Sequence, residues 1–168
     1  MENGFIGRVK RTYDNTNGNL GILLNGVKGT GKTVTAKQIC NKMNLPVIVV
    51  STPFEHIPDF INNIQQDVVI FIDEYEKIYT DRDHSVLIVM DGALDNGFRR
   101  IFLLTTNNLY INDNMIQRPG RIRYLKTYED LNRSAIEEIV DDKLQHTELR
   151  EVTIDFLSQR SEEHTSEL

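Results

Sequence analysis

Residues 20–33 decide the fold and read LGILLNGVKGTGKT. The apolar stretch from Leu20 to Asn25 predicts a β-strand. Gly26 to Thr33 then match the pattern G-x-x-x-x-G-K-[ST], and Lys32 to Met43 contain neither Pro nor Gly, as a helix requires. A strand, a glycine loop and a helix in this order favour phosphate binding, because the loop N–H groups and the positive end of the helix face the phosphate.

The loop also predicts how a nucleotide and its metal are held. Lys32 would contact the β- and γ-phosphates of ATP, and the Thr33 hydroxyl would bind Mg²⁺. The predicted nucleotide-contacting residues of the loop are Gly26, Val27, Lys28, Gly29, Thr30, Gly31, Lys32 and Thr33. A glycine-rich turn with a surface lysine is the alternative, and the flanking strand and helix argue against it.

A second pair of polar residues follows a buried strand. Val68 to Ile72 are continuously apolar, as in a strand covered on both faces, and Asp73 and Glu74 come next. In open α/β folds ligands bind at this edge of the sheet. We therefore expect Asp73 to hold Mg²⁺ together with Thr33, and Glu74 to act as general base on the attacking water. An Asp-Glu pair that only caps a helix is the alternative.

The remaining pattern alternates strands with helices. Further strands are expected at Pro46–Val50, Ile101–Leu104 and Ile122–Leu125, and helices within Ile57–Ile64, from Asp83 to a C-cap at Gly97, and over Ser134–Leu144. Such alternation predicts an α/β protein with a doubly wound, parallel, five-stranded sheet of the P-loop NTPase class. The last helices would begin a helical lid.

We expect four segments along the chain. They are an N-terminal linker over residues 1–19, an α/β core over 20–126, the beginning of a helical lid over 127–159 and a tail over 160–168. The tail resembles the translation of a sequencing-library adapter, so we expect it to be non-native and the native frame to continue differently after Gln159. An ordinary polar terminus is the alternative.

Composition limits the classes of function. The net charge of −6 and the pI near 5.2 argue against a surface built mainly for nucleic acid, although they leave room for a local basic patch. Cys40 is the only cysteine, which excludes an internal disulfide and a cysteine zinc cluster. No stretch approaches the roughly 20 apolar residues of a membrane span. We therefore expect a cytoplasmic protein with no membrane partner.

Two further motifs complete a family resemblance. Ile101 to Leu104 are followed by Thr105-Thr106-Asn107, and residues 118–121 read RPGR. Together with the phosphate loop and the Asp-Glu pair, these motifs resemble AAA-plus ATPases of the AAA group over about residues 20–123. The resemblance implies that Asn107 is the polar sensor, and that Arg118 and Arg121 are arginine fingers acting on ATP held by a neighbouring subunit. Taken alone, Asn107 could be a turn residue and the arginines could flank an exposed Pro-Gly turn.

The resemblance also implies a function. The chain would be a Mg²⁺-dependent ATPase that assembles into a homo-oligomeric ring, a hexamer, and remodels a protein or a protein–nucleic acid complex. An ATP-switched loader that acts on DNA-bound partners is the alternative. A small-molecule kinase is a third possibility, but the sequence shows no arginine-rich lid of the kind that such a kinase would need. Residues 51–66 form a short segment that lacks the aromatic pore loop of many family members. In having such a short segment the chain resembles Bcs-type and bacteriophage AAA proteins. Arg123 stands where the family often has an acidic residue.

Overall fold

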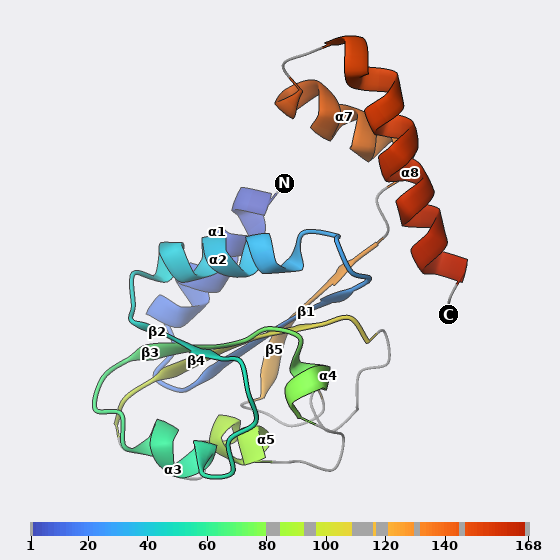
Figure 1. Cartoon of the computed structure of the whole chain (residues 1–168). Helices are drawn as coiled ribbons and strands as arrows, with labels where there is room; N and C mark the ends of the chain where they lie inside the picture. The colour runs from blue at the N-terminus through green and yellow to red at the C-terminus, as the bar shows by residue number, and fades with distance from the viewer. Residues whose placement is uncertain are drawn as a thin grey trace.

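The computed structural model describes residues 2–79, 85–92, 97–108, 116, 121–129, 132–144 and 147–166. Its centre is one parallel sheet with the strand order β2-β3-β4-β1-β5 (Figure 1). The strands are β1 Leu20–Gly26, β2 Val47–Val50, β3 Val68–Ile72, β4 Arg100–Thr106 and β5 Ile122–Tyr128. The expected five-stranded parallel α/β fold is therefore confirmed.

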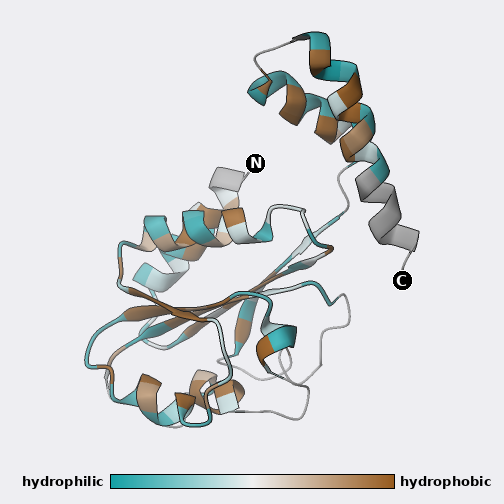
Figure 2. Cartoon of the chain, viewed as in Figure 1, coloured by the Kyte–Doolittle hydropathy of each residue, from teal (hydrophilic) through white to brown (hydrophobic). Residues whose placement is uncertain are grey.

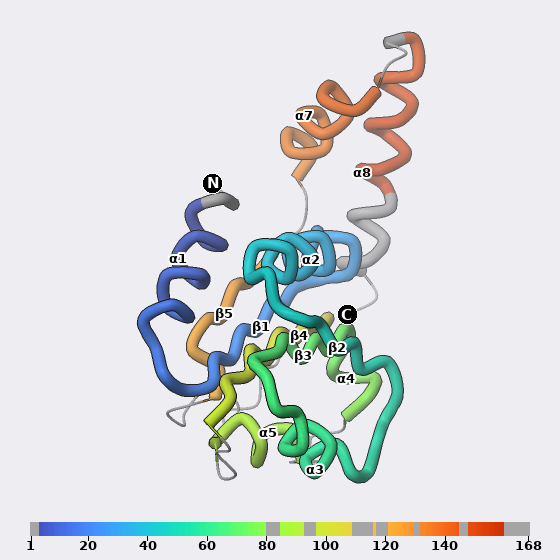
Figure 3. The backbone as a smooth tube through the Cα atoms, turned by 90° about the vertical axis from the view of Figure 1, so that its left-hand side faces the viewer, coloured from blue at the N-terminus to red at the C-terminus, as the bar shows by residue number. Residues whose placement is uncertain are grey.

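Helices cover both faces of this sheet (Figures 1 and 3). One face carries α1 and α2, and the other carries α3, α4 and α5. Their bounds are α1 Glu2–Asp14, α2 Lys32–Met43, α3 Ile57–Asn62, α4 Tyr75–Ile78 and α5 Ser85–Met90. The predicted helix after the glycine loop and the short helix after residue 57 are both found.

The core explains why the central strands read as unbroken apolar runs. Val68, Ile70 and Ile72 of β3 pack toward α3 and α5, whereas Val69 and Phe71 pack toward α1 and α2. Since neighbouring side chains of a strand point to opposite faces, a strand covered on both sides needs apolar residues throughout. Each fully buried aliphatic side chain contributes about 1.5–3 kcal/mol to stability. Figure 2 shows these strands in the brown of apolar residues.

The N-terminal segment corrects an expectation. The predicted linker over residues 1–19 is wrong for Glu2–Asp14, which form α1. Phe5, Ile6, Val9 and Tyr13 of this helix are buried among the residues of the sheet face that it shares with α2. Their spacing places them on one side of a helix. Physically, α1 is part of the core.

The helix after residue 85 is shorter than expected. α5 ends at Met90, and Gly92, with φ of 71°, follows in the left-handed region that ends many helices. Gly97 has a positive φ of 83° but lies seven residues beyond the last helical residue, so it is not the C-cap. Asp83, where the predicted helix begins, and residues 93–96, near its predicted end, lie outside the described residues.

β1 and the edge strand β5 approach each other closely at Gly21. A Cβ atom added there would lie 2.2 Å from the carbonyl oxygen of Arg121 and 2.8 Å from the Met90 Cε atom. The pairing of the two strands shifts register at this point, between Gly21 and Ile22. A glycine is therefore required by the approach of the neighbouring backbone.

The chain continues from β5 into a pair of helices, α7 Arg133–Lys143 and α8 Arg150–Ser166, with a 3₁₀ turn at Thr147–Leu149 before α8. The Asn132 side chain caps α7 by accepting a hydrogen bond from the Ala135 N–H at 2.9 Å. Ile136, Val140 and Ile154 form a small core between the two helices.

This pair stands apart from the sheet in Figure 1, as the beginning of a separate helical unit would. The backbone of α8 includes residues of the predicted tail, whose non-native origin stays a prediction. Among the residues that the structure describes, no helix is long and apolar enough to cross a membrane.

Candidate functional site

Parallel strands bring the sequence motifs to one edge of the sheet. β1 pairs with β4 and β4 with β3, all in the same direction, so their carboxyl ends lie together. The phosphate loop follows β1, Asp73 and Glu74 follow β3, and Asn107 follows β4. This arrangement joins residues up to about 80 positions apart in the chain into one site.

The loop has the backbone needed to present N–H groups at the start of α2. Gly31, the residue before the helix, has φ of 94°, a left-handed conformation that favours glycine. The Thr30 hydroxyl donates to the Val27 carbonyl at 2.9 Å and closes the turn. The first N–H groups of a helix have no partner within the helix, and the positive end of the dipole lies there, so the loop suits a phosphate.

Lys32 supplies the charge of the loop. Its side chain is only 6% exposed, and its Nζ atom donates to the carbonyl oxygens of Gly26 and Val27, each at 2.6 Å. Burial lowers the pKa of Lys32, whereas the nearby carboxylates of Glu76, Asp73 and Glu74 raise it, with burial the larger effect. An ammonium group close to the start of a helix has the charge and the N–H donors that suit phosphate oxygens.

Asp73 links the phosphate loop to β4 through hydrogen bonds. Its Oδ1 atom accepts hydrogen bonds from the Thr33 hydroxyl at 3.1 Å and from the Thr105 hydroxyl at 2.6 Å. A hydroxyl and a carboxylate so close together are the oxygen ligands that Mg²⁺ takes beside substrate phosphates. Sequence reasoning missed Thr105, although a polar residue closing the apolar run of β4 was the signal that could have revealed it.

Glu74 is held from three sides. Its backbone lies in the left-handed region, with φ of 51°, and its N–H donates to the Thr105 hydroxyl at 2.8 Å. One carboxylate oxygen, Oε1, accepts from Asn107 Nδ2 at 3.1 Å, and the other, Oε2, accepts from Lys77 Nζ at 2.7 Å. The bond from Lys77, followed by that from Asn107, lowers the pKa of Glu74, so the group is an ionised base at neutral pH.

Glu76 is a further acidic residue that sequence reasoning missed. Its Oε1 atom accepts a hydrogen bond from the Asn107 N–H at 3.0 Å, and this bond fixes the backbone that carries the Asn107 side chain. Its Oε2 atom is buried and has no hydrogen-bond partner within the described part of the chain. Nothing in the sequence separates Glu76 from an ordinary first-turn acid of a helix.

The donor set fits magnesium with a nucleotide rather than a protein-only metal site. Among the described residues, no group of three or more His, Cys, Asp or Glu could hold a metal ion. Mg²⁺ commonly uses one or two protein ligands and completes its shell with phosphates and water. Thr33 and Asp73 would hold it, next to the Lys32 ammonium group and the first N–H groups of α2.

Of the two predicted arginine fingers, only Arg121 lies among the described residues, and Arg118 lies outside them. Arg121 directly precedes β5 and therefore lies at the amino ends of the strands, whereas the phosphate loop lies at their carboxyl ends. Its side chain is 6% exposed. Its Nε and Nη2 atoms donate to the Asp91 carboxylate at 2.6 and 2.8 Å, and this pairing raises its pKa. Its role in a neighbouring subunit stays a prediction.

The region that holds this site is similar to known proteins. The model of the family described as "ATPase family associated with various cellular activities (AAA)" matches residues 22–127. The ATP-dependent zinc metalloprotease FtsH of Lactococcus lactis is 28% identical over 127 residues, which are 60% of this chain and 18% of FtsH. Proteasome-activating nucleotidase 2 of Haloferax volcanii is 32% identical over 128 residues, 60% of this chain and 31% of that protein.

These two relatives are much longer than the matched region. The chain therefore spans less than a third of their length. Among solved structures, the RuvB Holliday junction branch migration motor of Thermotoga maritima superposes with a TM-score of 0.60 at 15% identity, covering 83% of this chain and 48% of RuvB. At that identity the likeness supports the fold alone.

Proposed function

Because the chain belongs to the AAA family of ATPases, whose members use ATP with Mg²⁺, we propose that it binds Mg-ATP at the carboxyl edge of its sheet and hydrolyses it with Glu74. The observation that carries the proposal is the contact of the Thr33 hydroxyl and the Asp73 carboxylate, with the ionised Glu74 next in the chain. This contact supports the proposal, because phosphoryl transfer to water requires magnesium ligands close to a base.

Each residue then has a distinct task. The loop N–H groups and Lys32 bind phosphate oxygens, and Mg²⁺ on Thr33 and Asp73 would neutralise their charge. Glu74 accepts a proton from the attacking water, and Asn107, already bonded to Glu74 Oε1, orients that water. Thr105 fixes both carboxylates, since its hydroxyl bonds to Asp73 and to the Glu74 N–H.

We also propose a homo-oligomeric ring, a hexamer, in which an arginine acts on ATP bound by the neighbouring subunit. Of the two candidates, Arg121 would first have to leave its bidentate pair with Asp91. Breaking such a pair leaves a partly buried carboxylate without its partner, which costs free energy. We therefore favour Arg118 for this task.

For the work done with ATP, we propose remodelling of a protein substrate by a cytoplasmic ring. The names of the matched relatives, an ATP-dependent protease and a proteasome-activating nucleotidase, support action on proteins. A loader of partners onto DNA is the alternative. Stimulation of ATP hydrolysis separates the two functions, because a folded protein would stimulate the remodelling enzyme and DNA would stimulate the loader.

Calorimetric titration of the chain with Mg-ATP tests the core of the proposal. Saturable binding should be lost in Lys32→Ala and kept in Lys37→Ala, since Lys37 is an exposed lysine farther along the same helix. Equal binding by both variants would remove the phosphate loop from the proposal. If binding persists and no phosphate is released by the assembled protein, the chain is an ATP-binding module and not an ATPase.

A further inference from the structure

A basic groove lies between α1 and β5, away from the nucleotide site. The groove has a volume of about 420 Å³. Arg8, Arg11 and Arg123 line it, together with the hydrogen-bonding side chains of Thr12, Asn15, Thr16 and Tyr124. Figure 3 shows α1 beside β5, so residues more than 100 positions apart form the two walls.

The arginines of this groove carry charge that their surroundings leave available. All three are exposed, and the ion pairs formed among the described residues include none of them. Elsewhere on the same helix, Lys10 is paired with Asp14. Guanidinium groups that line one groove repel one another, and a bound anion offsets this repulsion, so their grouping in a chain of net charge −6 points to an anionic ligand.

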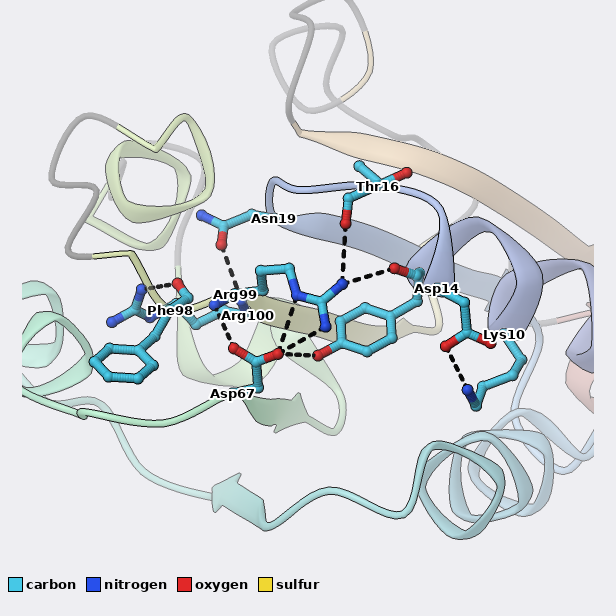
Figure 4. A network of polar contacts seen from close by, with 9 residues as sticks. Lys10, Asp14, Thr16, Asn19, Asp67, Phe98, Arg99 and Arg100 are labelled. Atoms are coloured by element: carbon cyan, nitrogen blue, oxygen red, sulfur yellow. Dashed lines mark hydrogen bonds and ion pairs between the residues drawn. The ribbon is translucent and has the colours of Figure 1, made fainter.

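The walls of the groove are held in place without the ligand. The hydroxyl groups of Thr12 and Tyr124 are 2.6 Å apart, and the Tyr124 ring meets Phe5 edge-on with centroids 5.9 Å apart. The Thr16 carbonyl accepts a hydrogen bond from Arg99 at 3.0 Å, which fixes the turn after α1 (Figure 4). A preformed site loses little conformational freedom when it binds.

We propose that this groove binds the sugar–phosphate backbone of a nucleic acid strand. Guanidinium groups match phosphate oxygens in a two-pronged geometry, and the hydroxyl and amide groups of Thr12, Asn15 and Thr16 are typical further backbone contacts. Apart from Tyr124, whose ring packs edge-on against Phe5, every residue that lines the groove is polar or charged, which favours a phosphate backbone over a peptide. Such a polar, positively charged surface is typical of nucleic acid interfaces.

The groove is separate from the site proposed for ATP. Arg123 lies near the start of β5, whereas Tyr128 at the end of that strand reaches Thr35 of the helix after the phosphate loop. Binding of the strand therefore needs no residue of the nucleotide site. The two proposals can fail independently, because each is measured with its own ligand.

Fluorescence anisotropy with the complete chain and a fluorescein-labelled single-stranded DNA of about 20 nucleotides tests the groove. The triple variant Arg8→Gln, Arg11→Gln, Arg123→Gln should weaken binding at least about tenfold. If three phosphates are neutralised, log K should fall with log salt with a slope of about −2 in the native chain and near zero in the variant. The variant should keep the unfolding temperature of the native chain, since all three arginines are exposed, and this shows that it is folded.

The matched control removes the same charge elsewhere. Lys37→Gln, Lys42→Gln, Lys143→Gln acts on three exposed lysines of α2 and α7 and should leave DNA binding within about twofold, because only local contacts carry the affinity. Equal losses in the two variants would show bulk electrostatics and overturn the proposal. Absence of DNA binding by the native chain would also overturn it. So would displacement of the DNA by poly-glutamate at equal charge, which would assign the groove to an acidic peptide.

Discussion

The two edges of the sheet use charge in opposite ways. At the amino edge Asp67 accepts hydrogen bonds from the Tyr13 hydroxyl at 2.6 Å and from the Arg99 N–H and Nε at 2.8 and 3.0 Å (Figure 4). At the carboxyl edge Asp73 accepts only from the hydroxyls of Thr33 and Thr105 among described residues, and Glu76 keeps a buried oxygen without a partner. The amino edge pairs Asp67 with Arg99, whereas the carboxyl edge, apart from the pair of Glu74 with Lys77, leaves carboxylate oxygens available for a ligand.

This difference separates stability from function. A partly buried charge with several partners holds elements together, because removing one partner leaves the other uncompensated. At the amino edge, Arg99 also lies over the Tyr13 ring at 4.0 Å and donates to the Tyr13 carbonyl, so α1 is tied to β3 and β4. Substitutions at the amino edge should therefore change unfolding, and those at the carboxyl edge should change ATP chemistry.

The largest effect is expected for Glu74→Gln. The amide keeps the shape of the side chain but cannot take the proton of the attacking water, so turnover should fall by about 10³ while ATP still binds. Phosphate release and calorimetry measure the two quantities, with the exposed Glu55→Gln as control. Loss of ATP binding together with a lower unfolding temperature would mean that Glu74 is structural, which would break the contrast between the edges.

The second largest effect is expected for Arg121→Ala at the amino edge. Removing the guanidinium leaves the Asp91 carboxylate without its bidentate partner, so the free energy of unfolding should fall by about 3 kcal/mol. Denaturant unfolding measures this change, and Arg123→Ala, an exposed neighbour two residues on, should stay within about 0.5 kcal/mol. Unchanged stability combined with lost hydrolysis in the assembled protein would instead assign Arg121 as a finger.

A smaller loss of stability is expected for Asp67→Asn. The amide weakens the bonds to Tyr13 and Arg99, and we expect a cost of about 2 kcal/mol at neutral pH with no change in ATP binding. Burial alone would raise the pKa of Asp67, but the hydrogen bonds from Tyr13 and Arg99 outweigh it and lower the pKa below 3.8.

The loss of stability in Asp67→Asn should depend on pH, and the lowered pKa of Asp67 sets the direction of this dependence. A lowered carboxyl pKa stabilises the fold above the unfolded-state value, and this stability is lost as pH falls through the folded-state pKa. The difference in unfolding free energy between the native chain and Asp67→Asn should therefore shrink below about pH 4. A difference that is constant across that range would show that hydrogen-bond geometry, and not charge, carries the network. Asp14→Asn at an exposed pair is the control.

The smallest effect is expected for Lys77→Met at the carboxyl edge. Lys77 occupies Glu74 Oε2, so its removal should free the base and raise turnover at neutral pH, by less than about fivefold because the pair is exposed. Lys77 is also the main cause of the lowered pKa of Glu74. The acid limb of the pH–rate profile should therefore move to higher pH. An unmoved limb in Lys77→Met, or a moved one in Lys77→Arg, would contradict this role.

Local sequence patterns predicted the frame of the molecule well. The limits of α2 and β3 agree with the expected ones because glycine loops and β-branched runs act over a few residues. α1 was missed because Gly4 and Gly7 lower its helix propensity, whereas its burial against the sheet, which stabilises it, is a tertiary effect.

The site residues show the same difference between local patterns and tertiary contacts. Thr33, Asp73 and Glu74 were predicted because a motif or a strand end marks them. Thr105 and Lys77 were not, since their contacts depend on which strands become neighbours and on the rotamers chosen. The pair between Arg121 and Asp91 likewise joins residues 30 positions apart, and no local sequence pattern predicts it.

Gly21 has a consequence for reading mutational tolerance. It lies at the amino end of β1, yet any side chain there would press on the carbonyl of Arg121, the residue just before the neighbouring strand β5. In a saturation library selected for activity, this position should be as depleted of substitutions as Lys32. A tolerance map alone would thus mark Gly21 as an active-site residue, and only an assay that scores folding separately would assign its intolerance to the seam between two strands.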